Sequence, residues 1–410
     1  MRIFFISFTY SPPYFGGGLN RMIKHLKSVQ SRGYQITVLT SGVPGYPAKE
    51  IDEGLQIFRS PSISASKLGR AIRRLIFPFW ARYRLIKLKP DIVHIEGLGG
   101  LTPIFEYFAT FTLTAAAKRI GAASIKQHTL ADGEEEMFKV DGFKFRLRLA
   151  AWKKFSAVVS VSPALHHAVQ QHLLDNSFCI MNGVDTQLFS PLSKLDRDNF
   201  RKNLNLCEED VVFTFLGSIG VRKGFDLIAQ AFSELSRAHP DWHLWIVGPR
   251  SKSESQNIDD DEVSKLVSIL QPCEDKVTYW GRVDEQEQMA KILASSDIFV
   301  FPTRREGFPN APLEAMACGL PVIMSRIEGV TDQIIDEGVT GHFIEVGDEE
   351  ELKQKFILLG SDKDLRLSMS KAARAKVQEE FGWEKYIMDW ENLYQMCLTE
   401  SKLHICKGLG

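Results

Sequence analysis

Residues 305–322 read Arg-Glu-Gly-Phe-Pro-Asn-Ala-Pro-Leu-Glu-Ala-Met-Ala-Cys-Gly-Leu-Pro-Val, and they follow a short apolar run at 298–301. Such a run is typical of a strand that is buried on both faces of a parallel sheet. Pro312 suits the first turn of a helix, whereas Gly319 and Pro321 end that helix. A strand, a loop and a helix start in this order predict an anion site at the carboxyl edge of the sheet, because the free N–H groups of a helix start attract phosphate.

Two glutamates belong to this segment. Glu306 is expected on the rim of the site, and Glu314, on the first turn of the helix, could accept hydrogen bonds from two adjacent hydroxyls such as those of a ribose. A lone pair of this kind is also explained by a loop charge and by the helix dipole. The whole segment, however, resembles the signature of retaining glycosyltransferases of family 4, in which two glutamates separated by seven residues contact the sugar donor. The resemblance implies that four further residues bind the donor: Gly307, Phe308, Pro309 and Asn310.

Apolar runs alternate with helical patterns along both halves of the chain. The expected strands of the first half are 2–8, 35–39, 92–95, 122–127, 157–161 and 178–181. Those of the second half are 211–216, 243–247, 277–280, 298–301 and 322–324. This alternation predicts an α/β fold with one parallel sheet in each half, covered by helices on both faces.

The family resemblance covers nearly the whole chain, including the junction at 182–189 and the segment 338–343. It implies the GT-B fold, with two Rossmann-like domains facing each other across a cleft. The expected acceptor domain is 1–189, completed by a helix at about 384–410 that crosses back to it. The expected donor domain is 190–383.

Glycines follow the first strand of the first half, and cations follow the first strand of the second half. Gly17 and Gly18 precede a helix, and without a Cβ they could let the backbone approach a diphosphate. In the second half, Arg222 and Lys223 provide positive charge that would stabilise a departing diphosphate. The resemblance implies the same role for Lys223. Ser218 departs from the family, whose members usually carry an arginine there, and Arg222 is expected to compensate.

His128 is the candidate for contact with the transferred sugar. It follows an expected strand, and an imidazole can hydrogen-bond a sugar and transfer protons near neutral pH. A single histidine is more often structural, but the resemblance implies an active-site histidine at this position. His94 ends another strand and ranks below it, Asp132 is a weaker candidate, and the run 134–136 is expected to be a solvated face.

Arg282 begins the loop in which, by the resemblance, the protein holds the base of the nucleotide. That contact is expected mostly through backbone groups near Val283. The segment 328–332 differs from the pattern of relatives, so Asp332 has no assigned role.

Composition predicts a two-domain globular protein, since the 410 residues are 44% hydrophobic and 25% charged. The six cysteines lack the spacing of metal or redox sites, which indicates a reducing compartment. The first eight residues are too short for a secretory signal, and no run of about 18 apolar residues is present. These features predict a cytoplasmic location, in which the protein could also lie peripherally on the membrane.

Charge is unevenly distributed. Residues 1–190 carry a net charge of +11 and residues 191–410 one of −12, so the first half is expected to face an anionic partner. No nucleic-acid-binding motif accompanies the basic residues. Residues 67–89 hold eight Lys and Arg and no acidic residue, interleaved with apolar side chains. Two alternatives remain open for this stretch: a helix that packs on the sheet, with Pro78 interrupting it, or a docking element for an anionic membrane.

These observations predict a retaining hexosyl- or related glycosyltransferase (class 2.4) that uses a UDP- or GDP-linked sugar without a metal or other cofactor. The acceptor is expected to be a hydroxyl of a glycan or of a lipid-linked molecule, in the synthesis of cell-surface polysaccharide or glycolipid. Two alternatives remain: a catalytically impaired partner subunit that binds nucleotide sugars, and a sugar-nucleotide epimerase of the same fold.

Overall fold

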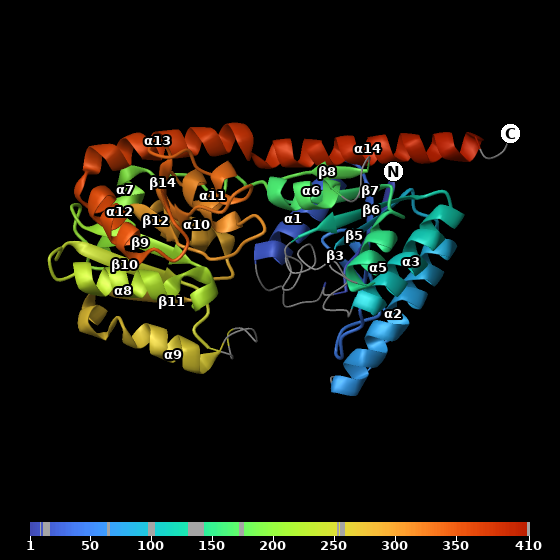
Figure 1. Cartoon of the computed structure of the whole chain (residues 1–410), viewed down its shortest axis with the longest axis horizontal. Coiled ribbons are helices and arrows are strands. Elements are labelled where there is room, and N and C mark those ends of the chain that lie inside the picture. The colour runs from blue at the N-terminus through green and yellow to red at the C-terminus, as the bar shows by residue number, and fades with distance from the viewer. Residues whose placement is uncertain are drawn as a thin grey trace. The chain divides into compact units, whose positions relative to one another are not determined.

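The computed structural model describes residues 1–8, 10, 17–63, 66–96, 103–129, 143–171, 176–251, 254 and 259–407. The chain divides into two compact units (Figure 1). Unit 1 comprises Met1–Met181 and Tyr386–Gly410, and unit 2 comprises Asn182–Lys385.

The described strands of unit 1 form one sheet in the order β3-β4-β2-β1-β5-β6-β7-β8. They are β1 Arg2–Ile6, β2 Gln35–Thr40, β3 Lys49–Asp52, β4 Leu55–Arg59, β5 Ile92–Glu96, β6 Ala123–His128, β7 Ala157–Ser160 and β8 Ser177–Cys179. Every neighbouring pair is parallel except β3 with β4. The strands predicted for this half are confirmed to within two residues.

The β3–β4 hairpin was not predicted. β3 is an edge strand whose four residues are half-buried or exposed, so it lacks the apolar run that marks the inner strands. The sequence signal that could have found it is Gly54 at the turn, where Glu53 and Gly54 both have positive φ, 44° and 88°. A two-residue turn of this kind, with glycine in second place, is typical of a tight hairpin.

Helices cover the sheet of unit 1 (Figure 1). They are α1 Gly17–Ser31, α2 Lys67–Leu88, α3 Pro103–Arg119, α5 Phe143–Trp152, α6 Pro163–Gln170 and α14 Trp383–Lys407. The expected interruption at Pro78 is wrong, since α2 runs through this proline as one helix. Buried Phe77, Ala81 and Leu85 pack both halves of α2 into the core, and this packing outweighs the cost of about 3 kcal/mol for a proline within a helix.

The described strands of unit 2 form a parallel sheet in the order β11-β10-β9-β12-β13-β14. They are β9 Val211–Leu216, β10 Trp242–Val247, β11 Val277–Gly281, β12 Ile298–Phe301, β13 Val322–Ser325 and β14 Gly341–Ile344. The α-helices are α7 Lys194–Lys202, α8 Phe225–Leu235, α9 Asp260–Ser268, α10 Gln286–Ala294, α11 Asn310–Ala317, α12 Glu349–Ser361 and α13 Lys363–Glu380, and the short 3₁₀ turns are η1 Val221–Lys223, η2 Gln271–Lys276 and η3 Thr331–Gln333. Parallel sheets in both halves and the predicted strands of unit 2 are thereby confirmed.

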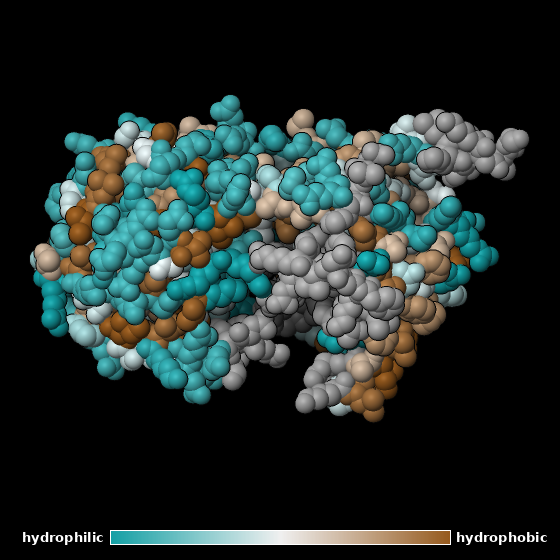
Figure 2. Space-filling model, viewed as in Figure 1, coloured by the Kyte–Doolittle hydropathy of each residue, from teal (hydrophilic) through white to brown (hydrophobic). Residues whose placement is uncertain are grey.

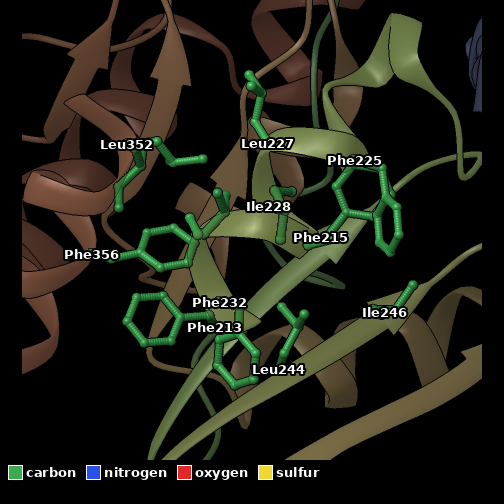
Figure 3. Close-up of a cluster of buried hydrophobic side chains, with 14 of the residues drawn as sticks. Phe213, Phe215, Phe225, Leu227, Ile228, Phe232, Leu244, Ile246, Leu352 and Phe356 are labelled. Atoms are coloured by element: carbon green, nitrogen blue, oxygen red, sulfur yellow. The ribbon is translucent and has the colours of Figure 1, made fainter. Parts of the chain in front are cut away.

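The core of unit 2 is rich in aromatic side chains between the sheet, α8 and α12. Figure 3 shows Phe213 and Phe215 of β9 among side chains from both helices. Phe213 stacks on Phe356 of α12, with their ring centroids 4.5 Å apart, and lies 5.0 Å from Trp242. This packing holds β9 at the centre of the sheet and so positions the loop that follows it.

The final helix, α14, packs an aromatic row on unit 1. Its residues Tyr386, Trp390 and Tyr394 recur every four positions and are buried. The Tyr394 hydroxyl lies 2.8 Å from Nδ1 of His94 and 3.0 Å from Nε2 of His25, and Trp390 stacks on the His94 ring at 4.7 Å. The helix therefore supplies part of the core of the first sheet.

Among the described helices, none combines the length and the apolar character needed to cross a bilayer.

Candidate functional site

The site of unit 2 is built where β9 and β12 end. The two strands are neighbours and parallel, so the loops that follow them leave the same edge of the sheet. Gly224 brings these loops into contact, because a Cβ on this residue would lie 1.9 Å from the carbonyl oxygen of Pro302. Gly224 also has a φ of 73°, which favours glycine. The cations after β9 are thereby set against the glutamate after β12.

Glu306 is the centre of this arrangement. Its Oε1 accepts a hydrogen bond from Nζ of Lys223, lies 3.4 Å from Nη1 of Arg222, and accepts from Oγ1 of Thr303 at 3.2 Å. The side chain of Glu306 is 12% exposed and that of Lys223 17%, whereas Arg222 is half exposed. The structure thus brings Arg222, Lys223 and Glu306 together at the carboxyl ends of their strands, where the sequence placed each of them, and their direct contact was not predicted.

Burial controls the charge of Lys223. Removal of its ammonium from water lowers the pKa of Lys223 below its ordinary value, although attraction and a hydrogen bond to Glu306 oppose this shift. The nearby Arg222 lowers the pKa further. The ammonium therefore depends on an anion for its stability, whether the anion is Glu306 or a bound phosphate.

A second ion pair supports the first, and the sequence analysis did not identify it. Arg304 donates two hydrogen bonds to the carboxylate of Asp226, each 2.7 Å long, and a third to the carbonyl of Val221. The Arg304 backbone N–H also donates to the Arg222 carbonyl at 2.9 Å. Arg304 therefore fastens the η1 turn to the loop after β12. The only signal in the sequence was the doublet of arginines before Glu306, which does not reveal a distant partner.

The loop after Glu306 leads directly into α11. Pro309 is the N-cap residue, Asn310 is the first helical residue, and Gly319, with a φ of 83°, follows the helix end, as predicted. Glu314 is the fifth residue of α11, so it lies about one residue beyond the first turn in which it was expected. The reason is that the helix starts before Pro312, which occupies an early position where its missing N–H is not needed.

Buried contacts hold this loop in place. Gly307 and Phe308 are buried, and the Phe308 carbonyl accepts a hydrogen bond of 2.9 Å from Nδ2 of Asn182. Phe308 also lies 5.9 Å from Phe381. Asn182 is a positioning residue that sequence reasoning missed, because the two segments are far apart in the chain.

Arg282 and Val283 follow β11. Arg282 donates to Oδ1 of Asp284 at 2.7 Å and to the carbonyl of Glu254 at 2.9 Å. Its side chain is therefore hydrogen-bonded both to its own loop and to the segment at Glu254. Val283 is partly buried against the cluster around Trp245. Their contact with a base stays a prediction.

The candidates of the first half lie in unit 1. Gly17 is the first residue of α1, and open space surrounds Gly18, where an added Cβ would meet no atom within 4 Å. His128 ends β6 and is fully buried, with its ring edge-to-face on Trp152 at 4.9 Å. Its role in sugar contact stays a prediction. Asp132 and the run 134–136 lie outside the described residues.

His94 has a structural environment. It is fully buried between Phe5, Trp390 and Tyr394. Burial, together with the charge of Arg21, lowers the pKa of His94 to about 3. The neutral ring therefore serves the packing of α14, in line with its lower rank among the sequence candidates.

The cluster in unit 2 has the chemistry of an anion site. Arg222 and Lys223 share the carboxylate of Glu306, whereas Arg304 is paired with Asp226. Two cations on one carboxylate at a strand end, next to a helix start, favour a phosphate group. Among the described residues, no group of three or more His, Cys, Asp or Glu side chains could hold a metal ion. Metal independence stays a prediction.

Two family models match the chain in succession. The model described as Glycosyltransferase Family 4 matches residues 16–188, and the model described as Glycosyl transferases group 1 matches residues 196–376. An uncharacterized glycosyltransferase of Haemophilus influenzae is 30% identical over 381 residues, which are 92% of this chain and 96% of that protein.

Two further relatives have specific names. The N-acetyl-alpha-D-glucosaminyl L-malate synthase of Bacillus anthracis is 28% identical over 54% of this chain. A GDP-mannose-dependent monoacylated alpha-(1-6)-phosphatidylinositol monomannoside mannosyltransferase of Corynebacterium glutamicum is 33% identical over 50% of this chain. The matches span about half the length of these two relatives, 54% and 52%.

Solved structures agree on the fold. The sucrose-phosphate synthase of Thermosynechococcus elongatus superposes with a TM-score of 0.79 at 19% identity, covering 97% of this chain and 99% of that one. Anabaena HepE in complex with UDP and glucose has a TM-score of 0.73 at 17% identity and covers 97% and 100%. The expected GT-B fold is confirmed by this likeness.

Proposed function

The chain belongs to glycosyltransferase family 4, and from this premise we propose that it transfers a sugar from a UDP- or GDP-linked donor to a hydroxyl. The acceptor is a glycan or a lipid-linked molecule, and the reaction retains the anomeric configuration. Two names support the donor class: the Corynebacterium glutamicum relative depends on GDP-mannose, and Anabaena HepE has been solved with UDP. The first of these also names a phosphatidylinositol mannoside, which supports an acceptor in glycolipid or cell-surface polysaccharide synthesis.

The observation that carries the proposal is the contact of Glu306 with Lys223 and Arg222. An ion pair that served stability alone would not need a second, half-exposed cation at 3.4 Å. Here Arg222 and Lys223 share a single carboxylate, so the site retains positive charge for a diphosphate. Lys223 is the inner of the two cations, and its ammonium can exchange Glu306 for a phosphate oxygen without first entering water.

The proposed reaction follows from these groups. The bond between the anomeric carbon and the leaving phosphate oxygen breaks, and the acceptor oxygen bonds to the same face of the sugar. The proton of the acceptor hydroxyl passes to the departing phosphate. Lys223, Arg222 and the N-terminal end of α11 stabilise the diphosphate, whereas Glu306 binds the sugar. Glu314 is assigned the ribose, and His128 is assigned the sugar by family resemblance alone.

A thermal-shift panel of UDP, GDP, ADP, CMP and their common sugar conjugates tests the donor class, each with magnesium and with a chelator. One nucleoside diphosphate is expected to raise the apparent melting temperature in both conditions, because it binds the folded state. A screen of hydroxyl acceptors with the matching sugar conjugate then tests transfer. A shift only with magnesium would contradict metal independence, and a shift without transfer or slow donor hydrolysis would contradict the enzymatic function.

One observation favours a second candidate, a nucleotide-sugar-binding subunit without transfer activity. Ser218 is exposed after β9, at a position where the family resemblance implies an arginine. Replacement of Ser218 by arginine separates the two candidates. A large gain in turnover would indicate that the serine impairs the natural enzyme, whereas little change would indicate that Arg222 already supplies the charge.

A further inference from the structure

Unit 1 carries an exposed apolar ridge along two neighbouring helices, α2 and α3 (Figure 2). We call it the α2–α3 ridge, and its side chains are between 36% and 71% exposed. It consists of Leu68, Ile72, Leu75, Ile76, Phe79 and Tyr83 of α2 and Phe105, Phe108 and Phe111 of α3. Half of the exposed large apolar side chains in the described part of the chain therefore lie on two of its helices.

The ridge is a continuous surface and not a scatter of single residues. On α2 its members lie three or four positions apart, except that Leu75 and Ile76 are adjacent. They therefore occupy one side of the helix. On α3 they are spaced three apart. Phe79 and Phe108 join the two rows, with ring centroids 5.3 Å apart. A joined apolar surface of this kind marks an interaction site in a folded protein.

Packing of the fold does not account for the ridge. The opposite side of α2 already buries Phe77, Ala81 and Leu85 in the core of unit 1, and α3 buries Ala109 and Leu113. Each helix is thus apolar on two sides, of which only one is used by the sheet. Both alternatives that the sequence left open for residues 67–89 concerned one apolar stripe, whereas the structure shows two.

Cations accompany the ridge. At 100° per residue, Arg82 and Lys87 fall on opposite edges of the α2 row. Within the part of the chain that the structure describes, no carboxylate lies at ion-pairing distance from either of them. The Lys87 ammonium lies 5.9 Å from the ring of Tyr83, which belongs to the ridge. An aromatic ring beside a cation is typical of the boundary between headgroups and acyl chains.

We propose that the α2–α3 ridge docks unit 1 on an anionic phospholipid surface. The apolar side chains enter the boundary of the bilayer, and the flanking cations bind acidic headgroups. Charge argues against a second copy of this chain as the occupant, because a symmetric contact would bring two arginine- and lysine-edged rows together. The proposal does not depend on the transfer reaction, since it concerns a surface outside the residues assigned to it.

Vesicle sedimentation of the full chain tests the proposal. The probes are vesicles of phosphatidylcholine alone and vesicles in which one third of the lipid is phosphatidylglycerol. We expect a partition coefficient at least about tenfold higher on the anionic vesicles at low salt, decreasing as salt screens the headgroups. Equal recovery with both kinds of vesicle at low salt would overturn the proposal.

Paired variants locate the contact. The double variant Leu75→Ser with Phe79→Ser is expected to lower the partition coefficient about tenfold. The matched control is Ile357→Ser with Leu358→Ser, which removes apolar side chains of similar exposure, 44% and 41%, from α12 of unit 2. This control is expected to bind like the natural protein. Equal loss in both double variants would refute a role for the ridge.

A charge variant keeps the test independent of folding. Arg82→Gln with Lys87→Gln leaves the apolar rows intact, and we expect it to abolish most of the difference between anionic and neutral vesicles. Two outcomes would assign the surface to a protein partner and so overturn the proposal. One is a dimer in sedimentation velocity that the Leu75→Ser and Phe79→Ser variant disperses. The other is binding to soluble polyglutamate that is as tight as binding to the vesicles.

Discussion

Both units gather charged and polar side chains at the carboxyl ends of parallel strands, but they treat these groups in opposite ways. In unit 2, Lys223 and Arg222 converge on Glu306, and one of the cations is half exposed. In unit 1, the Arg21 guanidinium donates to Glu96 at 2.6 Å and to the Tyr386 hydroxyl at 2.7 Å, with both charged side chains nearly buried. The first cluster has cations to spare, whereas the second pairs its charges internally.

The difference distinguishes a ligand-binding site from a cluster that serves the packing of the fold. A buried and fully paired cluster contributes to specific packing but offers little to a ligand, because its charges are already balanced. In unit 1 one partner of Arg21, Tyr386, comes from α14, whose aromatic row covers His25 and His94. A cluster with excess charge and access to water is costly to maintain and is suited to an anion. The comparison therefore predicts that equivalent substitutions change activity in unit 2 and stability in unit 1.

The largest expected effect is on turnover. Glu306→Gln and Lys223→Met are each expected to lower kcat about a hundredfold to a thousandfold, because each removes a charge that acts on the reacting sugar or on the leaving diphosphate. Steady-state kinetics with the donor and acceptor found in the screens measure this loss. The double variant should lose little more than either single one, since the two groups act together.

Matched substitutions on α13 control for the change of charge. Lys371→Met and Glu379→Gln alter exposed residues of the same unit, and both variants are expected to keep the natural turnover. A circular-dichroism melt checks that the site variants remain folded. If Glu306→Gln has the natural turnover, the glutamate has no role in the mechanism. The contrast between the two clusters would then be refuted as well.

The two clusters also differ in how well the sequence predicts them. Strand positions and the end of α11 follow from apolar runs and from Gly319, which are local signals, whereas the start of α11 lies two residues before Pro312. The placement of Lys223 and Glu306 at one edge of the sheet also follows, because both come after strands of a parallel sheet, but their contact was seen only in the structure. Local patterns are sufficient wherever the partner is fixed by the topology of the sheet.

Long-range side-chain partners were not predictable in the same way. Nothing near His94 in the sequence indicates that Tyr394 will bind it from a helix 300 residues later. Arg304 with Asp226 and Asn182 with Phe308 are similar cases, since each contact depends on how distant segments pack. The edge strand β3 was missed for another reason: its half-exposed residues resemble a loop, and only the positive-φ turn beside it indicates a hairpin.

The second expected effect is a loss of stability in acid. Burial lowers the pKa of His94 to about 3 and that of His25 well below its ordinary value of 6.5. Arg21 and Lys126 oppose protonation of His94, whereas a hydrogen bond to Gln127 favours it. Above pH 6.5 both rings are neutral in the folded and unfolded states, and the free energy of unfolding is unaffected. As the pH falls below 6.5, only the unfolded chain takes up the protons, so stability decreases by roughly 1.4 kcal/mol per pH unit for each histidine.

Denaturant unfolding between pH 7 and pH 4 measures this slope. His94→Gln is expected to reduce the slope of stability against pH by the contribution of one histidine. The variant is also less stable at pH 7, because it loses the contacts with Trp390 and Tyr394. The same substitution at the exposed His167 serves as the control and should leave the slope unchanged. If His94→Gln has the natural slope, the ring does not stay neutral under α14.

The smallest expected effect concerns Arg304, which belongs to the open cluster but acts as a positioning residue. It holds the η1 turn through its paired hydrogen bonds to Asp226 and its bond to the Val221 carbonyl. Its side chain and that of Asp226 are 29% and 18% exposed, so water screens the pair and Arg304→Met should cost only about 1 kcal/mol of stability. The same variant is expected to lower kcat about tenfold, because Arg222 and Lys223 lose their support and misplacement of such groups slows a reaction.

A purely structural role would give a different pattern. It would lower the free energy of unfolding and leave kcat and the affinity for the nucleoside diphosphate unchanged. Arg304→Lys distinguishes the two, since a lysine keeps the charge but cannot make the paired contact, so turnover should stay closer to that of Arg304→Met than to that of the natural protein. A double-mutant cycle with Asp226→Asn should show a coupling of about 0.5 kcal/mol or more in turnover as well as in stability. If the coupling appears in stability alone, Arg304 has a structural role like that of the paired cluster in unit 1. The contrast between the two clusters would then be weaker.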